Sequence, residues 1–178
     1  GTRHSMKSFE QSHLLAGFRG LPYTDSSFYT AQVLSGVLGG GMSSRLFQEA
    51  RENRGLCYSI YSSAWGLRDT GMLAIHAATG AEMMSELIDV VAAELDGMAS
   101  TVPPEREVAR ARAQLKAGLL MGLEGCSARA EQMARQLMMV NRIVPTEEII
   151  ARVDDVTPEK VRALMERTLA EKPPAIAV

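Results

Sequence analysis

The sequence has no excess of either charge and no long hydrophobic run. It contains 178 residues, of which 19 are basic and 21 acidic, for a net charge of −2. A charge this close to zero provides no general attraction to nucleic acid or to an anionic membrane surface. No apolar stretch approaches the roughly 20 residues that a membrane-spanning helix needs. The sequence therefore predicts neither a nucleic-acid partner nor a membrane span.

Cysteine is also scarce. Cys57 and Cys126 lie in different segments, at a spacing that matches no metal or redox motif. We therefore expect two free, partly buried thiols, as in a reducing compartment. The N-terminal residues lack the apolar core of a signal peptide. A cytoplasmic location is the default expectation.

Histidine occurs three times, as His4, His13 and His76, and neither HxxEH nor HExxH is present. A tetrahedral zinc site needs several ligands that converge on one point. We therefore expect no metal site in this chain and no metal-dependent activity of the chain alone. His76 is interpreted as a strand residue with a satisfied hydrogen bond.

The two ends of the chain carry little information about its fold. Residues 1–6, GTRHSM, are typical of an expression-tag remnant, and residues 7–178 have the length of one domain. The sequence stops within a strand-like segment at residues 175–178. We therefore expect it to be a piece of a longer protein.

Hydrophobic periodicity and turn residues divide the chain into strands at both ends and in the middle, with helices between them. The predicted strands are residues 14–21, 58–67, 71–78 and 175–178; the predicted helices begin at Asp25, at Ser43 or Ser44, near Met84, at Glu105, near Gly125, at Pro145 and at Thr157. Alternating βαβ units are missing, which argues against a doubly wound nucleotide-binding fold. The pattern predicts an α+β fold, a mixed and largely antiparallel sheet with helices packed on one face.

A glycine triplet, residues 39–41, lies between the first two predicted helices. It has neither the preceding strand nor the lysine of a phosphate-binding loop. We interpret it as a turn in which glycine tolerates the backbone angles of a sharp reversal.

Arg51 and Tyr58 form the most informative pair for function. Arg51 is expected near the end of the second helix, and Tyr58 opens the following strand seven residues later. A guanidinium offers a rigid fork of donors and a phenol offers one directional donor, which together suit a peptide carbonyl or a developing oxyanion. The residues alone favour the plainer interpretation, in which Arg51 is a solvated helix end and Tyr58 a half-buried strand residue.

Residues 39–63 read GGGMSSRLFQEARENRGLCYSIYSS. This stretch resembles the signature of the C-terminal domains of the insulinase/pitrilysin family, the inverted-motif zinc peptidases, and most of all the bacterial branch akin to mitochondrial processing peptidase. Residues 110–116, 127–132 and 155–159 are similar to family sequences as well. The resemblance covers nearly the whole chain.

The resemblance implies a single C-terminal-type domain over residues 7–178. It would be paired with an N-terminal zinc-binding domain or a homologous catalytic subunit around a closed chamber that receives unfolded peptides. The zinc would belong to that missing half, and no cofactor to this chain. It also implies that Arg51 and Tyr58 reach toward substrate from the side that faces the zinc.

Three functions remain open on the sequence. The chain is expected to be the substrate-binding, non-metal half of a zinc-dependent metalloendopeptidase. The alternatives are a separate partner subunit of a two-chain processing-peptidase-like complex and a structural member without catalysis, like the family's respiratory-complex subunits. The presence of both Arg51 and Tyr58 disfavours the last.

Overall fold

The computed structural model describes residues 10–178, so the expected tag remnant at residues 1–6 lies outside the described residues. In chain order the elements are β1 (Ser12–Gly20), α1 (Phe28–Gly39), the π-helix η1 (Phe47–Asn53), β2 (Ser59–Gly66), β3 (Gly71–Thr79), the 3-10 turn η2 (Ala81–Met83), α2 (Met84–Ser100), α3 (Glu105–Gly122), α4 (Cys126–Val140), α5 (Thr146–Asp154), α6 (Pro158–Glu171) and β4 (Ala175–Ala177). No helix in this range is long and apolar enough to cross a bilayer.

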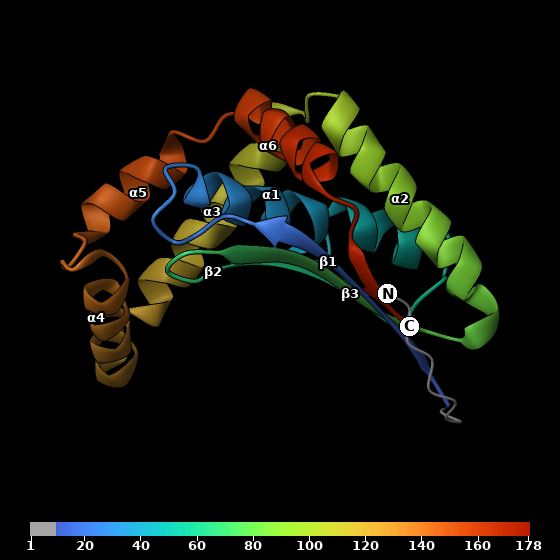
Figure 1. Ribbon diagram of the computed structural model, residues 1–178, viewed down its shortest axis with the longest axis horizontal. Helices are drawn as coiled ribbons and strands as arrows, with labels where there is room; N and C mark the ends of the chain where they lie inside the picture. The colour runs from blue at the N-terminus through green and yellow to red at the C-terminus, as the bar shows by residue number, and fades with distance from the viewer. Residues whose placement is uncertain (1–9) are drawn as a thin grey trace.

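The strands form one sheet in the order β2-β3-β1-β4. Most of the helices lie along one face of it, with α4 beyond the end of the sheet, and the sheet forms the concave side of an arch (Figure 1). The α+β expectation, with helices on one face, is confirmed. The sheet was expected to be mixed and largely antiparallel, and each pairing among the described strands is antiparallel.

Alternation along the strands places apolar side chains beneath the helices. In β1, Leu14, Ala16 and Phe18 are buried, whereas the residues between them are partly or well exposed. α1 contacts β2 on one side and α3 and α6 on others, so it is buried over much of its circumference. The core therefore lies between the sheet and the helical layer, with α1 at its centre.

Two helices were expected to begin at Asp25 and at Ser43 or Ser44, but neither Asp25 nor Ser44 caps its helix with its side chain. The carboxylate of Asp25 accepts a 2.7 Å hydrogen bond from the backbone N–H of Ser27, which itself precedes α1. Asp25 thus closes the turn before the helix. The hydroxyl of Ser44 donates to the carbonyl of Gly41 at 2.5 Å, so it does not accept from a helix N–H.

The glycine triplet stands at the C-terminal end of α1, where Gly39 is the last helical residue, for a different reason from the expected one. Among the described residues the only positive φ values are those of Gly55 and Asn141, so the triplet needs no left-handed backbone. A Cβ on Gly39 would instead lie 2.5 Å from the backbone nitrogen of Ser62 in β2. Nearby, the Ser62 hydroxyl donates a 2.8 Å hydrogen bond to the Ser35 carbonyl. Small residues therefore let α1 lie directly against β2.

Candidate functional site

Arg51 is held on the π-helix η1, one residue after the buried Ala50. Gly55 ends the helix with a φ of 63°, a conformation that glycine adopts without a steric penalty. The guanidinium carbon of Arg51 lies 4.7 Å from the centre of the Phe47 ring, within the range of a cation–π contact. The side chain is exposed, so its fork of N–H donors remains available to a ligand.

Tyr58 stands at the start of β2 and is anchored through its backbone. Its N–H donates a 2.9 Å hydrogen bond to the carbonyl of Ala78 in β3. The preceding Leu56 is buried, and its carbonyl accepts a hydrogen bond from the Thr79 hydroxyl. The Tyr58 side chain is nevertheless 68% exposed. A fixed backbone thus presents a free phenol to solvent.

The turn between the two residues leaves Arg51 and Tyr58 without a direct hydrogen bond. Burial raises the pKa of the Cys57 thiol, and the positive charge of Arg51 opposes that rise. Within residues 10–178, no hydrogen bond links the Arg51 guanidinium to the Tyr58 hydroxyl and no carboxylate forms an ion pair with Arg51. Both donors are therefore free for an external acceptor such as a peptide carbonyl.

Of the two carboxylates on this short helix, Glu49 is already engaged and Glu52 forms no ion pair with Arg51. Glu49 accepts hydrogen bonds from Asn53 at 2.9 Å and from Arg54 at 2.7 Å. These two donors hold the pKa of the Glu49 carboxyl below its usual value. Arg54 also lies 3.6 Å from Glu86 of α2. Glu49 and Glu86 thus bind Arg54, and Arg51 stays unpaired within the described chain.

The uncovered face of the sheet carries a second group of side chains. His13 of β1, His76 of β3 and Tyr61 of β2 stand in a row, with ring centroids 5.4 Å apart between the two histidines and 5.0 Å apart between His76 and Tyr61. The expected satisfied hydrogen bond of His76 is wrong in part. Its Nδ1 is buried without a hydrogen-bond partner in the described chain, while its Nε2 lies 3.3 Å from Nδ1 of His13.

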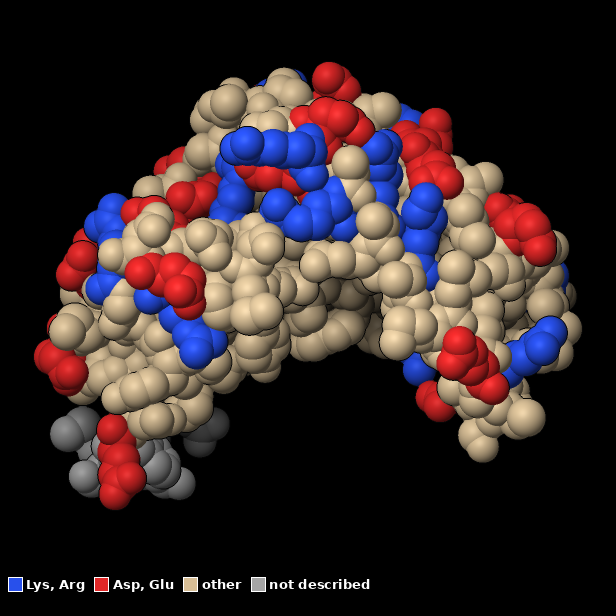
Figure 2. Space-filling model, turned by 180° about the vertical axis from the view of Figure 1, so that it is seen from behind, with Lys and Arg blue, Asp and Glu red and all other residues tan. Residues whose placement is uncertain are grey.

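The uncovered face also carries large apolar side chains, with Arg19 as a charged residue in phase with them. The exposed large hydrophobic residues on the inner side of the arch are Leu15, Tyr61, Trp65 and Met72. Figure 2 shows Lys, Arg, Asp and Glu concentrated over the helical side and few of them along the concave margin. A concave and weakly charged surface suits contact with an extended, partly apolar chain.

The likeness to known proteins covers most of the sequence. The family described as "Peptidase M16 inactive domain" matches residues 2–115. The chain belongs to this family. The expected insulinase/pitrilysin-type, non-zinc domain is thereby confirmed.

Curated relatives of this M16 inactive domain are named uncharacterized zinc proteases. One from Streptomyces coelicolor is 35% identical over 92% of this chain and 36% of its own length. One from Bacillus subtilis is 33% identical over 93% of this chain and 40% of its own length. The chain thus spans about two fifths or less of these relatives.

Solved structures agree on the fold. An M16 inactive domain from Pseudomonas fluorescens is 25% identical, with a TM-score of 0.80 over 94% of this chain and 40% of that chain. A chain of complex III from Candida albicans has a TM-score of 0.86 over 97% of this chain and 43% of that chain, at 16% identity. At that identity the second likeness concerns the fold alone.

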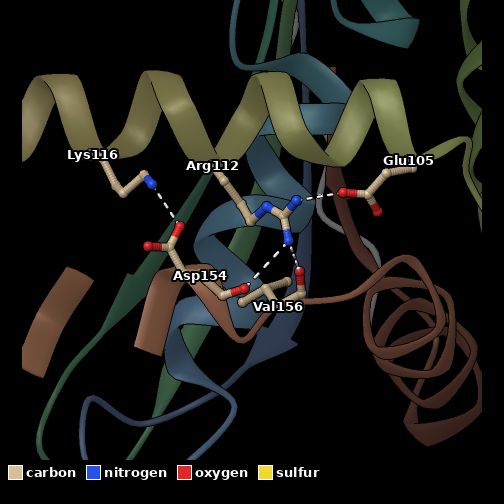
Figure 3. Close-up of polar contacts among 5 residues, drawn as sticks. All are labelled: Glu105, Arg112, Lys116, Asp154 and Val156. Carbon is tan, nitrogen blue, oxygen red and sulfur yellow. Dashed lines mark hydrogen bonds and ion pairs between the residues drawn. The ribbon is translucent and has the colours of Figure 1, made fainter. Parts of the chain in front are cut away.

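Two of the segments that resemble the M16 family meet in the structure. Arg112 of α3 donates to the carbonyls of Val156 at 2.9 Å and Asp154 at 3.3 Å, and it also pairs with Glu105 (Figure 3). Lys116, one turn further on, lies 2.6 Å from the carboxylate of Asp154. These contacts join α3 to the turn between α5 and α6. They stabilise the helical layer and lie away from Arg51 and Tyr58.

Sequence reasoning missed the row of rings on the uncovered face. His13 and His76 were treated as isolated residues because 63 positions separate them. Alternation along each strand shows which of its residues share a face. Only the register between strands places His13, His76 and Tyr61 next to one another. The free cysteines also differ from the expectation of partial burial, since Cys57 is buried and Cys126 is exposed. No group of three or more His, Cys, Asp or Glu side chains suited to a metal occurs among residues 10–178.

Proposed function

We propose that this M16 inactive domain is the substrate-binding, non-metal half of a zinc-dependent metalloendopeptidase that acts on unfolded peptides in a closed chamber. The observation that carries the proposal is the pair of exposed donors, Arg51 and Tyr58, on an anchored turn of a domain whose relatives are named zinc proteases. The exposed apolar side chains of Leu15, Trp65 and Met72 on the concave sheet face support the idea of a chamber wall. In this proposal the domain acts together with a zinc-binding half that lies outside residues 1–178.

Tyr58 and Arg51 have separate tasks in this proposal. The phenol of Tyr58 donates to the carbonyl oxygen of the scissile bond and donates more strongly as negative charge develops there. The guanidinium of Arg51 binds a backbone carbonyl of the peptide and orients it, because its planar fork holds a fixed geometry. Zinc held by the other half would supply the activated water. This chain alone is then expected to be inactive.

The test is the substitution Tyr58→Phe in the complete enzyme, in which this domain is combined with its zinc-binding half. Loss of one donor to an oxyanion lowers kcat by about 10²–10³. Tyr23→Phe is the matched control, because Tyr23 lies beside Phe28 and its N–H donates to the carbonyl of Leu67, at the opposite end of β2 from Tyr58. A kcat/KM of the Tyr58→Phe enzyme equal to that of the control would disprove the assigned task.

The substitution Arg51→Lys tests whether Arg51 acts by orienting the bound peptide or by its positive charge alone. Lysine keeps the positive charge but loses the fork, so we expect KM for a peptide to rise more than kcat falls. Arg54→Lys is the control, since Arg54 is already paired with Glu49. Equal KM values in the two variants would remove Arg51 from the substrate site.

A two-chain arrangement is the alternative within the same proposal. The gene that encodes this chain decides it: an HxxEH motif upstream in the same reading frame means one polypeptide. The motif in a neighbouring gene instead means a partner subunit. We place the protein in the cytoplasm as part of the proposal, because the free thiols of Cys57 and Cys126 suit a reducing compartment. Fractionation of cells that produce the full-length protein tests this location.

A further inference from the structure

The two histidines on the uncovered face point their ring nitrogens at each other. His13 pairs with Ala78 and His76 pairs with Leu15 in the β1–β3 register, so the histidines are diagonal neighbours on one face. Their facing atoms, Nδ1 of His13 and Nε2 of His76, are 3.3 Å apart. The His13 ring is exposed and the His76 ring is partly buried.

A hydrogen bond alone explains this arrangement poorly. The 3.3 Å separation of the two nitrogens is at the long end of hydrogen-bond distances. Nδ1 of His76 has no partner within the described chain, and it is not one of the two facing nitrogens.

We propose that His13 Nδ1 and His76 Nε2 form a two-imidazole site for a borderline divalent cation of the Zn²⁺ type. Two nitrogens bound at about 2.0–2.1 Å to a tetrahedral metal lie about 3.3 Å apart, which is the observed separation. The ion would enter between the rings without rearrangement of the strands. Its two remaining positions face the concave side, where water or a donor atom of a bound peptide completes the tetrahedron.

The surroundings favour this class of ion over a hard cation. Both ligands are imidazoles, which bind Zn²⁺, Cu²⁺ and Ni²⁺ and are poor ligands for Mg²⁺ or Ca²⁺. Burial, and then the charge of His13, lower the pKa of His76, so its ring is more readily the neutral form that binds a metal. The Tyr61 ring lies against His76 at 5.0 Å between centroids and restricts its rotation.

The test uses the 178-residue chain, stripped of metal and titrated with Zn²⁺ by calorimetry. We expect one equivalent to bind, and His13→Gln to weaken binding by at least about tenfold. His13 is exposed, so this variant keeps the core intact; His76→Gln, checked by circular dichroism, should have the same effect. His4→Gln and Cys126→Ser are the matched controls, and both should bind like the unaltered chain.

A second measurement identifies the bound atoms. Zn²⁺ should shift the imidazole nitrogen resonances of His13 and His76 and leave that of His4 unchanged. Binding that survives His13→Gln, or that is lost in His4→Gln or Cys126→Ser, would overturn the proposal. So would the absence of saturable Zn²⁺ binding to the unaltered chain.

Discussion

The two faces of the sheet are built from the same strands but carry side chains with different roles. On the covered face Ile75 is 0% exposed and packs among the side chains of the core. On the uncovered face Tyr61 and Trp65 are 50% and 51% exposed. The covered face supplies stability, whereas the uncovered face presents aromatic, imidazole and apolar groups to a concave surface. The difference teaches that side chains on the uncovered face can change with little effect on the fold, so their chemistry is open to a binding task.

The largest expected effect comes from a large-to-small change on the covered face. Ile75→Ala should lower the free energy of unfolding by about 2–5 kcal/mol, because it removes buried contacts and leaves a cavity. Leu15→Ala is the control on the uncovered face, where the side chain is 45% exposed. We expect it to cost about 1 kcal/mol or less, since only part of its apolar area is buried. Urea unfolding of both variants measures the difference. Equal losses of unfolding free energy would contradict the different roles of the two faces.

The sequence predicted the covered face better than the uncovered one. Alternation of buried residues such as Leu14 and Phe18 located β1, and the helical stripe that includes Leu87 and Leu95 located α2. Periodicity is sufficient there because burial is a local property of one element. The pairing of His13 with His76 depends on the register between strands distant in sequence, and no periodicity within one strand encodes that register.

The candidate site was predictable only in part. The positions of Arg51 and Tyr58 followed from the resemblance, and the turn at Gly55 followed from the residue type. The π-helix that carries Arg51 and the engagement of Glu49 by Arg54 were not predictable, because they arise from the packing of η1 against α2 and β2. The explanation of the glycine triplet as a turn was wrong. A close approach between two backbones and a turn with positive φ both favour glycine, so the sequence does not distinguish them.

An intermediate effect is expected where α1 touches the covered face. Gly39→Ala would place a Cβ 2.5 Å from the backbone nitrogen of Ser62, so either α1 or β2 must move. We expect a loss of about 1–3 kcal/mol, typical of overpacking, although alanine in a helix is otherwise favoured over glycine by about 1 kcal/mol. Gly41→Ala is the matched control, because its Cβ would meet only the Gln114 side chain, at 3.8 Å. Thermal unfolding that ranks Gly41→Ala as the more harmful change would show that the turn conformation, not the close approach, selects glycine.

The smallest expected effect is on the pH dependence of stability, through His76 on the uncovered face. Burial, and then the charge of His13, hold the pKa of His76 below its ordinary value of 6.5. The folded state therefore binds fewer protons than the unfolded state in this region, and stability present above pH 6.5 is lost as the pH falls through the lowered pKa. The groups that face His76 are the His13 ring from β1 and the Tyr61 ring from β2.

His76→Gln should therefore flatten the dependence of stability on pH between about pH 8 and about pH 5, the range in which histidine titrates. His13→Gln should keep most of that dependence, because burial is the larger cause of the lowered pKa and remains in this variant. Urea unfolding in the presence of a chelator measures both slopes without interference from bound metal. If His13→Gln flattened the dependence as fully as His76→Gln, the charge of one ring on the other would be the main cause. The partial burial of His76 would then contribute less to its lowered pKa than the charge of the neighbouring His13.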